Sequence, residues 1–315
     1  GVPLYRLESY FKNMQINLTR QTMANWIISA SNLTKPIYDE IKKELVSARI
    51  IHADETELEV LAEPERRPQT KSYMWVYTTG KSEDKNIILY DYKEGRSGKY
   101  AAEFLKGFTG YVHCDGWNGY DKVENIKRVG CWAHARRYFK EAINVQANIK
   151  DYSTVAGQGF LWIEKIFSTE DKITDAEEIK KIRETKGKEA VNGFFNFCET
   201  AEALPKSLTG KAVSYAINQK NNLIRYLENE NLEMTNNRAE RAVKPFVIGR
   251  KNWLFCNSPG GATASARLYS IIETAKANNL KIYDYLVWLF ENIHILPKTE
   301  LLPWSSKIPP NIRKG

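Results

Sequence analysis

The chain has 315 residues, of which 43% are hydrophobic and 27% are charged, and its formal net charge is +8. This length suggests about two domains with a full hydrophobic core. No apolar run approaches the roughly 20 residues that span a bilayer, and the N-terminus lacks the pattern of a signal peptide. A membrane protein is therefore excluded, and we expect a cytoplasmic one. Because residue 1 is Gly and not Met, we also expect a fragment of a longer protein.

Four cysteines are spread unevenly along the chain without a CxxC pair: Cys114, Cys131, Cys198 and Cys256. This spacing indicates neither a disulfide framework nor a zinc ribbon. We expect four reduced thiols.

The excess positive charge is concentrated in short clusters. They are Lys127-Arg128, Arg136-Arg137, Arg238 with Arg241 and Lys244, and Arg250-Lys251. Such clusters suit a polyanion, although the solvated faces of helices have the same composition. Basicity alone therefore favours nucleic acid only modestly.

Residues 1–48 are predicted to be helical. Apolar residues recur at helical spacing in two segments within 4–31, where Thr19 can cap the second helix, and a third helix is predicted over 36–48. Two helices joined by a short turn are typical of a helix-turn-helix, but also of any helical hairpin packed on a neighbouring core. Both interpretations stay open.

A strand is predicted over residues 49–60, and it contains one acid in an otherwise apolar row. Asp54 shares a face with Ile50 and Leu58, whereas Glu55 and its alternate neighbours share the other face. Burying an unpaired carboxylate costs several kcal/mol, so Asp54 should meet a cation, a hydrogen-bond network or a metal. Alone, Asp54 is equally compatible with a wet strand end.

The following residues predict more strands and helices. Segments 72–80 and 86–94 form a hairpin, a helix covers 98–107, and a strand ends at Asp115. A helix between two strands implies a parallel crossover. A fifth strand and the helix starting at CWAH complete a first part, residues 49–143.

The strand pattern then disappears. Residues 144–232 predict an all-helical insertion, in which the charged stretch 170–190 is expected to be exposed. In the part 233–294 we expect a short helix carrying Glu240, then strand-like residues after Pro245, and two further helices. The tail 295–315 is expected to be irregular.

Three carboxylates lie at junctions of these elements: Asp54, Asp115 and Glu240. Hard divalent cations prefer carboxylate oxygens, and two metals about 4 Å apart support phosphoryl transfer. Each acid also has a structural interpretation. Asp115 suits an Asp-Gly turn, and Glu240 suits a capping box with Asn237 as the N-cap. The coincidence of all three acids favours the metal site.

Several long motifs carry a resemblance to a known family. They are HADETELEVL, YVHCDGWNGYDKV, GCWAHARRYF, NNRAERAVKPFVIGRKNWLF, and the closing SIIETAKANNL with LLPW. From Pro3 to Trp304 the chain resembles the transposases of the insertion sequence sixty-six family, which belong to the DDE superfamily. The resemblance implies an α/β fold with a ribonuclease H-like catalytic core, in which a mixed five-stranded sheet with helices is interrupted by an all-helical insertion and preceded by a small helical segment.

The resemblance also implies a function and its residues. It implies metal-dependent cleavage of double-stranded DNA at element ends and strand transfer to target DNA, with two Mg²⁺ or Mn²⁺ ions held by Asp54, Asp115 and Glu240. We expect a homo-oligomer on DNA, because two ends must be joined, and a nucleoid-associated location. Upstream DNA-binding and zinc-binding segments are implied beyond this chain.

Further residues are assigned around the acids. Active-site support is expected from Cys131, His134, Asn236 and Asn237, and DNA contacts from Arg136, Arg137, Arg241, Lys244, Arg250 and Lys251. Cys131 and His134 have a spacing that suits zinc, but no second Cys/His pair is evident, so we expect no stoichiometric zinc in the purified protein. The family often has Asp where this chain has Thr235, which we expect to cap the following helix.

Two other functions compete with the transposase. One is a noncatalytic DNA-binding protein derived from such an enzyme, and intact acids at all three positions argue against it. The other is a ribonuclease H-like nuclease that cuts without joining, which the sequence leaves open.

Overall fold

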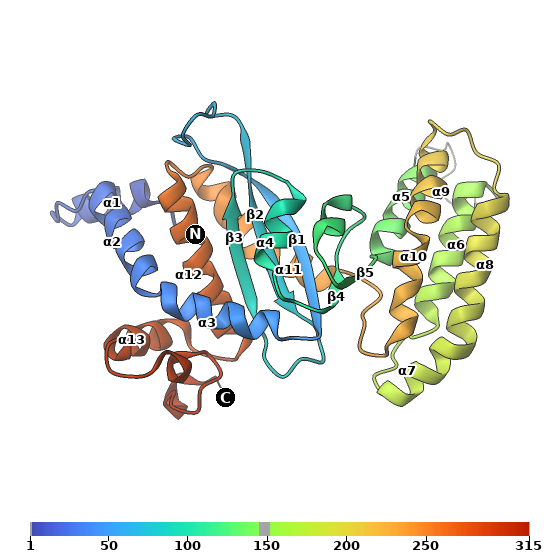
Figure 1. The fold of residues 1–315 in the computed structure, drawn as a ribbon. Helices are drawn as coiled ribbons and strands as arrows, with labels where there is room; N and C mark the ends of the chain where they lie inside the picture. Colours follow the sequence, from blue (N-terminus) through green and yellow to red (C-terminus); the bar gives the residue numbers. More distant parts are fainter. Residues whose placement is uncertain (1, 145–151, 315) are drawn as a thin grey trace.

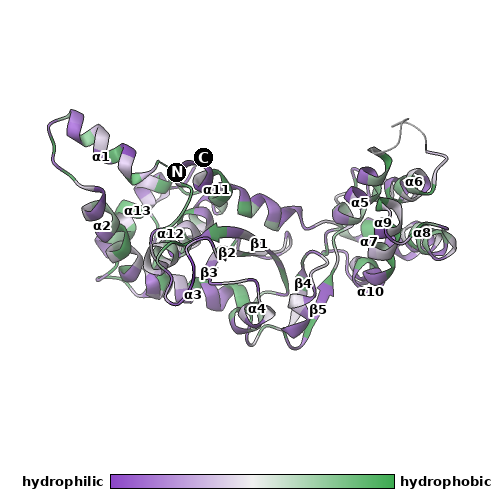
Figure 2. Cartoon of the chain, turned by 90° about the horizontal axis from the view of Figure 1, so that it is seen from above, coloured by the Kyte–Doolittle hydropathy of each residue, from purple (hydrophilic) through white to green (hydrophobic). Residues whose placement is uncertain are grey.

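The structure is a computed structural model that describes residues 2–144 and 152–314. The first residues of the predicted insertion, 145–151, lie outside the described residues. A five-stranded sheet separates the N-terminal helices from a bundle of helices at the opposite end, as two perpendicular views show (Figures 1 and 2). No helix of the described residues is long and apolar enough to cross a membrane.

The sheet is mixed, with the order β3-β2-β1-β4-β5. Its strands are β1 (Ile50–Glu59), β2 (Lys71–Thr79), β3 (Ile88–Lys93), β4 (Gly110–His113) and β5 (Ile126–Val129). The first three are antiparallel, and β4 and β5 run parallel to β1. The predicted meander, parallel crossover and ribonuclease H-like α/β fold are therefore confirmed.

Alternation along β2 divides the core between two faces of the sheet. Trp75 and Tyr77 belong to the apolar cluster on one face, where the ring of Tyr77 stacks on Phe104 with centroids 4.0 Å apart. Met74 and Val76 belong to the cluster on the other face. The first cluster includes residues of α3 (Lys35–Val46), α4 (Gly98–Phe104) and α13 (Ile282–Asn292), and the second includes residues of α11 (Asn237–Trp253) and α12 (Pro259–Ala277). Helices thus cover both faces of a strand that is buried on both sides.

Both edges of the sheet are covered. At β3, the hydroxyl of Ser270 on α12 accepts the Tyr90 N–H at 2.8 Å, and that of Thr274 accepts the Ile88 N–H at 3.1 Å. Beyond β5, the carbonyl of Asn222 accepts the Gly130 N–H at 2.9 Å. Edge groups that would otherwise stay unpaired are satisfied by side chains and loops of the same chain.

The N-terminal helices follow the prediction. They are α1 (Leu4–Asn13) and α2 (Arg20–Leu33), and the Thr19 hydroxyl caps α2 by accepting the Thr22 N–H at 3.1 Å. α1 buries none of its residues, whereas α2 buries Met23 and packs against α12. The hairpin is therefore attached to the core mainly through its second helix.

The insertion is helical, as predicted. It contains α6 (Val155–Ser168), α7 (Ala176–Ile182), α8 (Lys188–Thr200), α9 (Leu208–Asn218) and α10 (Lys220–Leu223). These helices pack with α5 (Trp132–Asn144), whose Trp132 contacts the rings of Phe194 and Tyr226. The expected exposure of the whole stretch 170–190 is wrong at Arg183, which is 3% exposed. Its guanidinium pairs with Glu170 and donates to backbone carbonyls, which compensates the buried charge.

The predicted break at Pro245 is also wrong. α11 continues through this residue as one helix of 17 residues and includes the segment expected to be strand-like. A proline inside a helix removes one hydrogen bond. Here Val243 and Phe246, on either side of the proline, are buried against the sheet, and this packing outweighs the lost bond.

Segments after α12 complete the core. Short 3₁₀ turns at Lys298–Leu301 and Pro310–Ile312 interrupt a tail that is otherwise irregular, as expected. Leu301 and Ile308 are nevertheless buried in the apolar cluster that contains α3 and α4. The tail is therefore an integral part of the core.

Candidate active site

The register of β1 and β4 places two of the predicted acids at one level. His52 pairs with His113 in the parallel ladder, and Asp54 and Asp115 each lie two residues further along the chain. Because β4 ends at His113, the two carboxylates lie beyond its carboxyl end. This is the end of a parallel pair at which α/β proteins place their ligands.

Glu240 joins them from α11, which packs against β1. The carboxylate of Glu240 lies close enough to Asp54 to affect its pKa. Burial raises the pKa of Asp54 to about 8, and the negative charges of Glu55, Asp115 and Glu240 add to the effect. The structure therefore brings the three predicted acids together, and Asp54 has no ion-pair partner among the described residues.

Asn236 fixes the start of α11 beside the acids. It is 1% exposed, its Nδ2 donates to the Ala53 carbonyl at 2.8 Å, and its Oδ1 is 3.1 Å from Nδ1 of His52. Its backbone N–H donates to Sγ of Cys131 at 3.2 Å. One buried residue thus connects α11 with β1, next to Asp54, and with the end of β5.

These contacts correct the predicted caps. Asn236 is the N-cap residue of α11 and makes no side-chain capping bond, so neither Asn237 nor Thr235 caps the helix. Asn237 is the first helical residue and is exposed. The amide of Asn236 is used instead to hold β1. Glu240 is therefore not part of a capping box, and its carboxylate lies near His134.

The two carboxylate oxygens of Asp115 have different partners. Its Oδ1 accepts the Trp117 N–H at 2.9 Å, so the turn interpretation is confirmed for one oxygen. Its Oδ2 lies 3.4 Å from Arg96, which also bonds the buried carboxylate of Glu55 at 2.5 Å. Tyr120 donates to the same carboxylate at 2.9 Å. Arg96 therefore bridges Asp115 to the opposite face of β1.

A second polar network was not predicted. His52 lies with Nε2 3.1 Å from Glu233, and Glu233 also pairs with Arg238 at 3.1 Å. Burial opposes ionisation of Glu233, but the His52 hydrogen bond and the Arg238 charge outweigh it and lower the pKa of Glu233 to about 2. The ring of His52 also contacts that of His113, with centroids 4.7 Å apart. This network supports the segment before α11.

Cys131 and His134 lie in the same region, as predicted. Nε2 of His134 is 3.8 Å from a carboxylate oxygen of Glu240. Burial, together with the charge of Arg137, lowers the pKa of His134 despite the nearby Glu240 and Asp115, so the ring is neutral near pH 7. Burial raises the pKa of the Cys131 thiol, although backbone N–H groups, that of Asn236 first, oppose the shift.

Comparison with known proteins decides the family. The family model described as "Transposase IS66 family" matches residues 1–264, which is most of the chain and includes all three acids. The chain belongs to the IS66 transposase family. The resemblance inferred from the motifs is therefore confirmed.

Relatives of this transposase domain occur in Sinorhizobium fredii (strain NBRC 101917 / NGR234). The protein named "Uncharacterized protein y4qI" is 29% identical over 98% of this chain and 60% of its own length. "Uncharacterized protein y4hP" is 27% identical over 97% of this chain and 59% of its own length. The chain thus spans about three fifths of the length of these curated relatives. No solved structure matches the chain.

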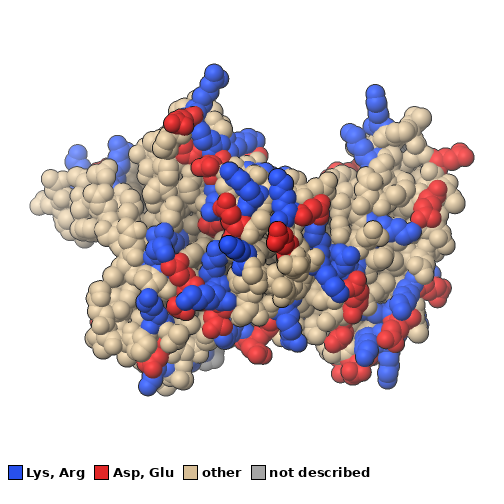
Figure 3. Space-filling model, viewed as in Figure 1, with Lys and Arg blue, Asp and Glu red and all other residues tan. Residues whose placement is uncertain are grey.

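The basic residues predicted to contact DNA differ in their surroundings. Exposed members without an ion-pair partner in the described part of the chain are Arg137, Arg241, Lys244 and Lys251. Arg136 pairs with Glu164 and lies 5.2 Å over the ring of Phe160. Arg250 donates to Thr56 at 3.0 Å and to the Glu57 carbonyl, so its guanidinium binds β1. On the face in Figure 3, basic and acidic side chains are interspersed.

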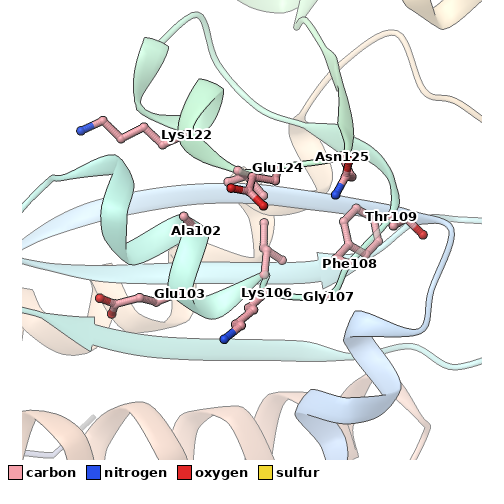
Figure 4. Close-up of a pocket in the computed structure, with 11 residues that line it drawn as sticks. Ala102, Glu103, Lys106, Gly107, Phe108, Thr109, Lys122, Glu124 and Asn125 are labelled. Atoms are coloured by element: carbon pink, nitrogen blue, oxygen red, sulfur yellow. The ribbon is translucent and has the colours of Figure 1, made fainter.

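A surface pocket lies elsewhere in the transposase domain. It is lined by the end of α4 and the following turn, with Lys106 and Gly107, and by the segment 122–125 (Figure 4). None of its lining residues belongs to the predicted site. The acids instead lie at the junction of β1, β4 and α11.

Asn236→Ala is expected to destabilise the protein by about 1–3 kcal/mol, because the Ala53 carbonyl and His52 Nδ1 lose a buried partner. Urea denaturation measures the free energy of unfolding. Asn237→Ala is the matched control, since this neighbour is exposed and should change stability by less than about 0.5 kcal/mol. Equal effects of the two substitutions would contradict the role given to Asn236.

Proposed function

We propose that this chain is the catalytic domain of a DNA transposase. In this proposal Asp54, Asp115 and Glu240 hold two Mg²⁺ or Mn²⁺ ions, and the domain uses water to hydrolyse a phosphodiester at the element end. The freed 3′-hydroxyl then attacks a phosphodiester of target DNA, whose own 3′-oxygen leaves. The observation that carries the proposal is the convergence of three acids at the junction of β1, β4 and α11, where burial and then the charges of the neighbouring carboxylates raise the pKa of Asp54 to about 8. Divalent cations fit such a set of oxygen donors and neutralise its charge.

The bound ions would activate the attacking hydroxyl and stabilise the leaving oxygen. The chain contributes the positions of the ligands. β1 and the end of β4 fix Asp54 and Asp115 through the sheet, and Asn236 fixes α11 and thus Glu240. Arg96 lies 3.4 Å from Oδ2 of Asp115, and a metal ion bound by Asp115 would take the place of this cationic partner.

The nearest competing function is a nuclease that cuts without joining. The test is incubation of the chain with a labelled duplex that carries the terminal sequence of its element, with a target plasmid, in Mg²⁺ or in EDTA. We expect metal-dependent cleavage followed by label joined to the plasmid. Cleavage without joined product would favour the nuclease, and stable binding without cleavage would favour the noncatalytic DNA-binding protein.

Removal of a phosphate contact gives a separate test of the DNA surface. Lys251→Ala should weaken binding to every duplex and reduce the dependence of log K on log salt by about one unit, because one counterion fewer is released. Arg250→Ala is the paired variant. The guanidinium of Arg250 is bound to β1. We therefore expect Arg250→Ala to lower the melting temperature and to change the salt slope less than Lys251→Ala does.

Affinity measured at several salt concentrations, together with thermal unfolding, separates these two effects. An unchanged salt slope in Lys251→Ala would remove Lys251 from the DNA surface. A reduced slope with an unchanged melting temperature in Arg250→Ala would instead place Arg250 on DNA.

Assembly and location follow from the proposed reaction. Since two element ends must be joined to one target, we infer that copies of the chain form a homo-oligomer on DNA. The proposed substrate places the protein with the nucleoid in the cytoplasm.

A further inference from the structure

Cys131, His134 and Glu240 form a cluster that the proposed reaction does not explain. Cys131 follows β5, His134 lies in the first turn of α5, and Glu240 comes from α11. One ligand atom of each residue, a sulfur, a ring nitrogen and a carboxylate oxygen, lies within 4.8 Å of the other two. The sequence offered only the first two donors, and the fold supplies the third from a segment more than a hundred residues away.

We propose that these three residues bind a divalent cation of the Zn²⁺ class and that this ion competes with the magnesium pair for Glu240. Only the competition rests on the proposed function. The binding site stands on its own donors.

The donor set selects the metal. Thiolate and imidazole favour borderline-soft transition metals, whereas Mg²⁺ prefers oxygen ligands and binds a thiolate such as that of Cys131 poorly. Zinc bonds of about 2.0–2.3 Å place tetrahedral ligand atoms roughly 3.5 Å apart. Because the present atoms lie within 4.8 Å of one another, small side-chain movements close the site.

The surroundings of each donor suit a metal ligand. Sγ of Cys131 accepts the Asn236 N–H at 3.2 Å, which offsets part of the cost that burial imposes on a thiolate. Nδ1 of His134 is buried without a hydrogen-bond partner in the described part of the chain, and its Nε2 faces Glu240 at 3.8 Å. Either ring nitrogen is therefore free of a competing bond.

The site is open on one side. The side chain of Glu240 is 39% exposed, against 16% for His134, so an ion and a water ligand reach the cluster from the side of Glu240. Three protein ligands with an open fourth position characterise exchangeable and catalytic sites, whereas structural zinc sites are closed by four. The ion therefore exchanges with solvent, and protein purified without zinc is compatible with this inference.

Sharing of Glu240 makes the two sites compete. A carboxylate turned toward Cys131 and His134 is withdrawn from Asp54 and Asp115. A zinc-class ion thus removes the third acid from the magnesium pair, and occupation of the magnesium pair weakens the zinc-class site by the same factor.

Titration of the metal-free full chain with Co²⁺ tests the site without an activity assay. Co²⁺ replaces Zn²⁺, and its bond to a thiolate gives a near-ultraviolet charge-transfer band. We expect one such site per chain, displaced by Zn²⁺, and a loss of affinity of at least about tenfold in Cys131→Ser and in His134→Ala. Cys114→Ser is the matched control, since Cys114 is another buried free thiol, next to Asp115, and it should keep the band.

Added Mg²⁺ tests the competition. It should weaken Co²⁺ binding to the parent chain but not to Asp54→Asn, in which the magnesium pair lacks a ligand. The band should itself persist in Asp54→Asn.

No thiolate band, or a band that survives in Cys131→Ser with folding confirmed by circular dichroism, would overturn the site. A band that Mg²⁺ leaves unchanged would overturn the sharing of Glu240, whereas a failure to cleave DNA with an intact band would overturn only the proposed function.

Discussion

Asp54→Asn, Asp115→Asn and Glu240→Gln are each expected to lower Mg²⁺-dependent DNA cleavage by about 10³-fold or more while the fold and the affinity for DNA stay largely intact. Each change keeps the size of the side chain and removes one negative charge from the place where the metals are proposed to bind. Loss of a preorganised electrostatic group at a reaction centre has effects of about 10²–10³-fold or larger. Single-turnover cleavage of an end-labelled duplex measures the effect.

Glu57→Gln is the matched control for these variants. Glu57 lies on the same strand as Asp54, is exposed, and pairs with Lys71 at the surface at 2.7 Å. The same loss of one carboxylate charge should leave the cleavage rate within about twofold, since an exposed ion pair is worth little. A member of the acid trio whose variant cleaves like Glu57→Gln has no place among the metal ligands.

The second large effect is a pH-dependent gain in stability from Asp54→Asn in the absence of metal. Burial raises the pKa of Asp54 to about 8 in the folded chain, from an ordinary value of 3.8. Between these values the folded state holds a proton that the unfolded state has released. Stability of the parent chain therefore falls as pH rises from about 4 to 8, by up to about 1.4 kcal/mol per pH unit, and is constant with respect to this group above pH 8.

Asparagine does not titrate. The difference in the free energy of unfolding between Asp54→Asn and the parent chain should therefore widen over the same pH interval and reach a few kcal/mol. Urea denaturation of both chains in EDTA at pH 5 and at pH 8 measures it. Added Mg²⁺ should stabilise the parent chain more at pH 8 than at pH 6, because the ion requires the ionised carboxylate. A difference that stays constant with pH would show that Asp54 ionises like an exposed carboxyl group.

Strands and helices with a clear apolar period were predictable from the sequence. The alternation along 49–60 predicted β1, and the β-branched and aromatic residues of 72–80 predicted β2. Asp54 was identified because it interrupted the apolar row of β1. The continuous helix α11 was not predictable from local pattern. Proline in a basic segment indicates a break, and only the packing of Phe246 on the sheet reverses this preference.

The site was partly predictable for the same reason. The three acids lie at junctions that element order identifies, but their polar partners come from distant segments. Arg96 follows a polar turn and carries no local sign that it will bridge Glu55 and Asp115. Arg250 was assigned to DNA because it is basic, and no local pattern indicated that its guanidinium bonds to Thr56 on β1. Such pairings depend on tertiary contacts that periodicity does not encode.

The covered edges of the sheet determine how copies of this chain can associate. The hydroxyls of Ser270 and Thr274 accept two N–H groups of β3, and the carbonyl of Asn222 accepts the N–H of Gly130 beyond β5. Addition of a strand from another molecule, which is a common route to both dimers and fibrils, is therefore hindered at the β3 edge. A partially unfolded form in which α12 has detached would expose the unpaired backbone groups of β3. Resistance of this protein to aggregation should therefore depend on the packing of α12 against that strand.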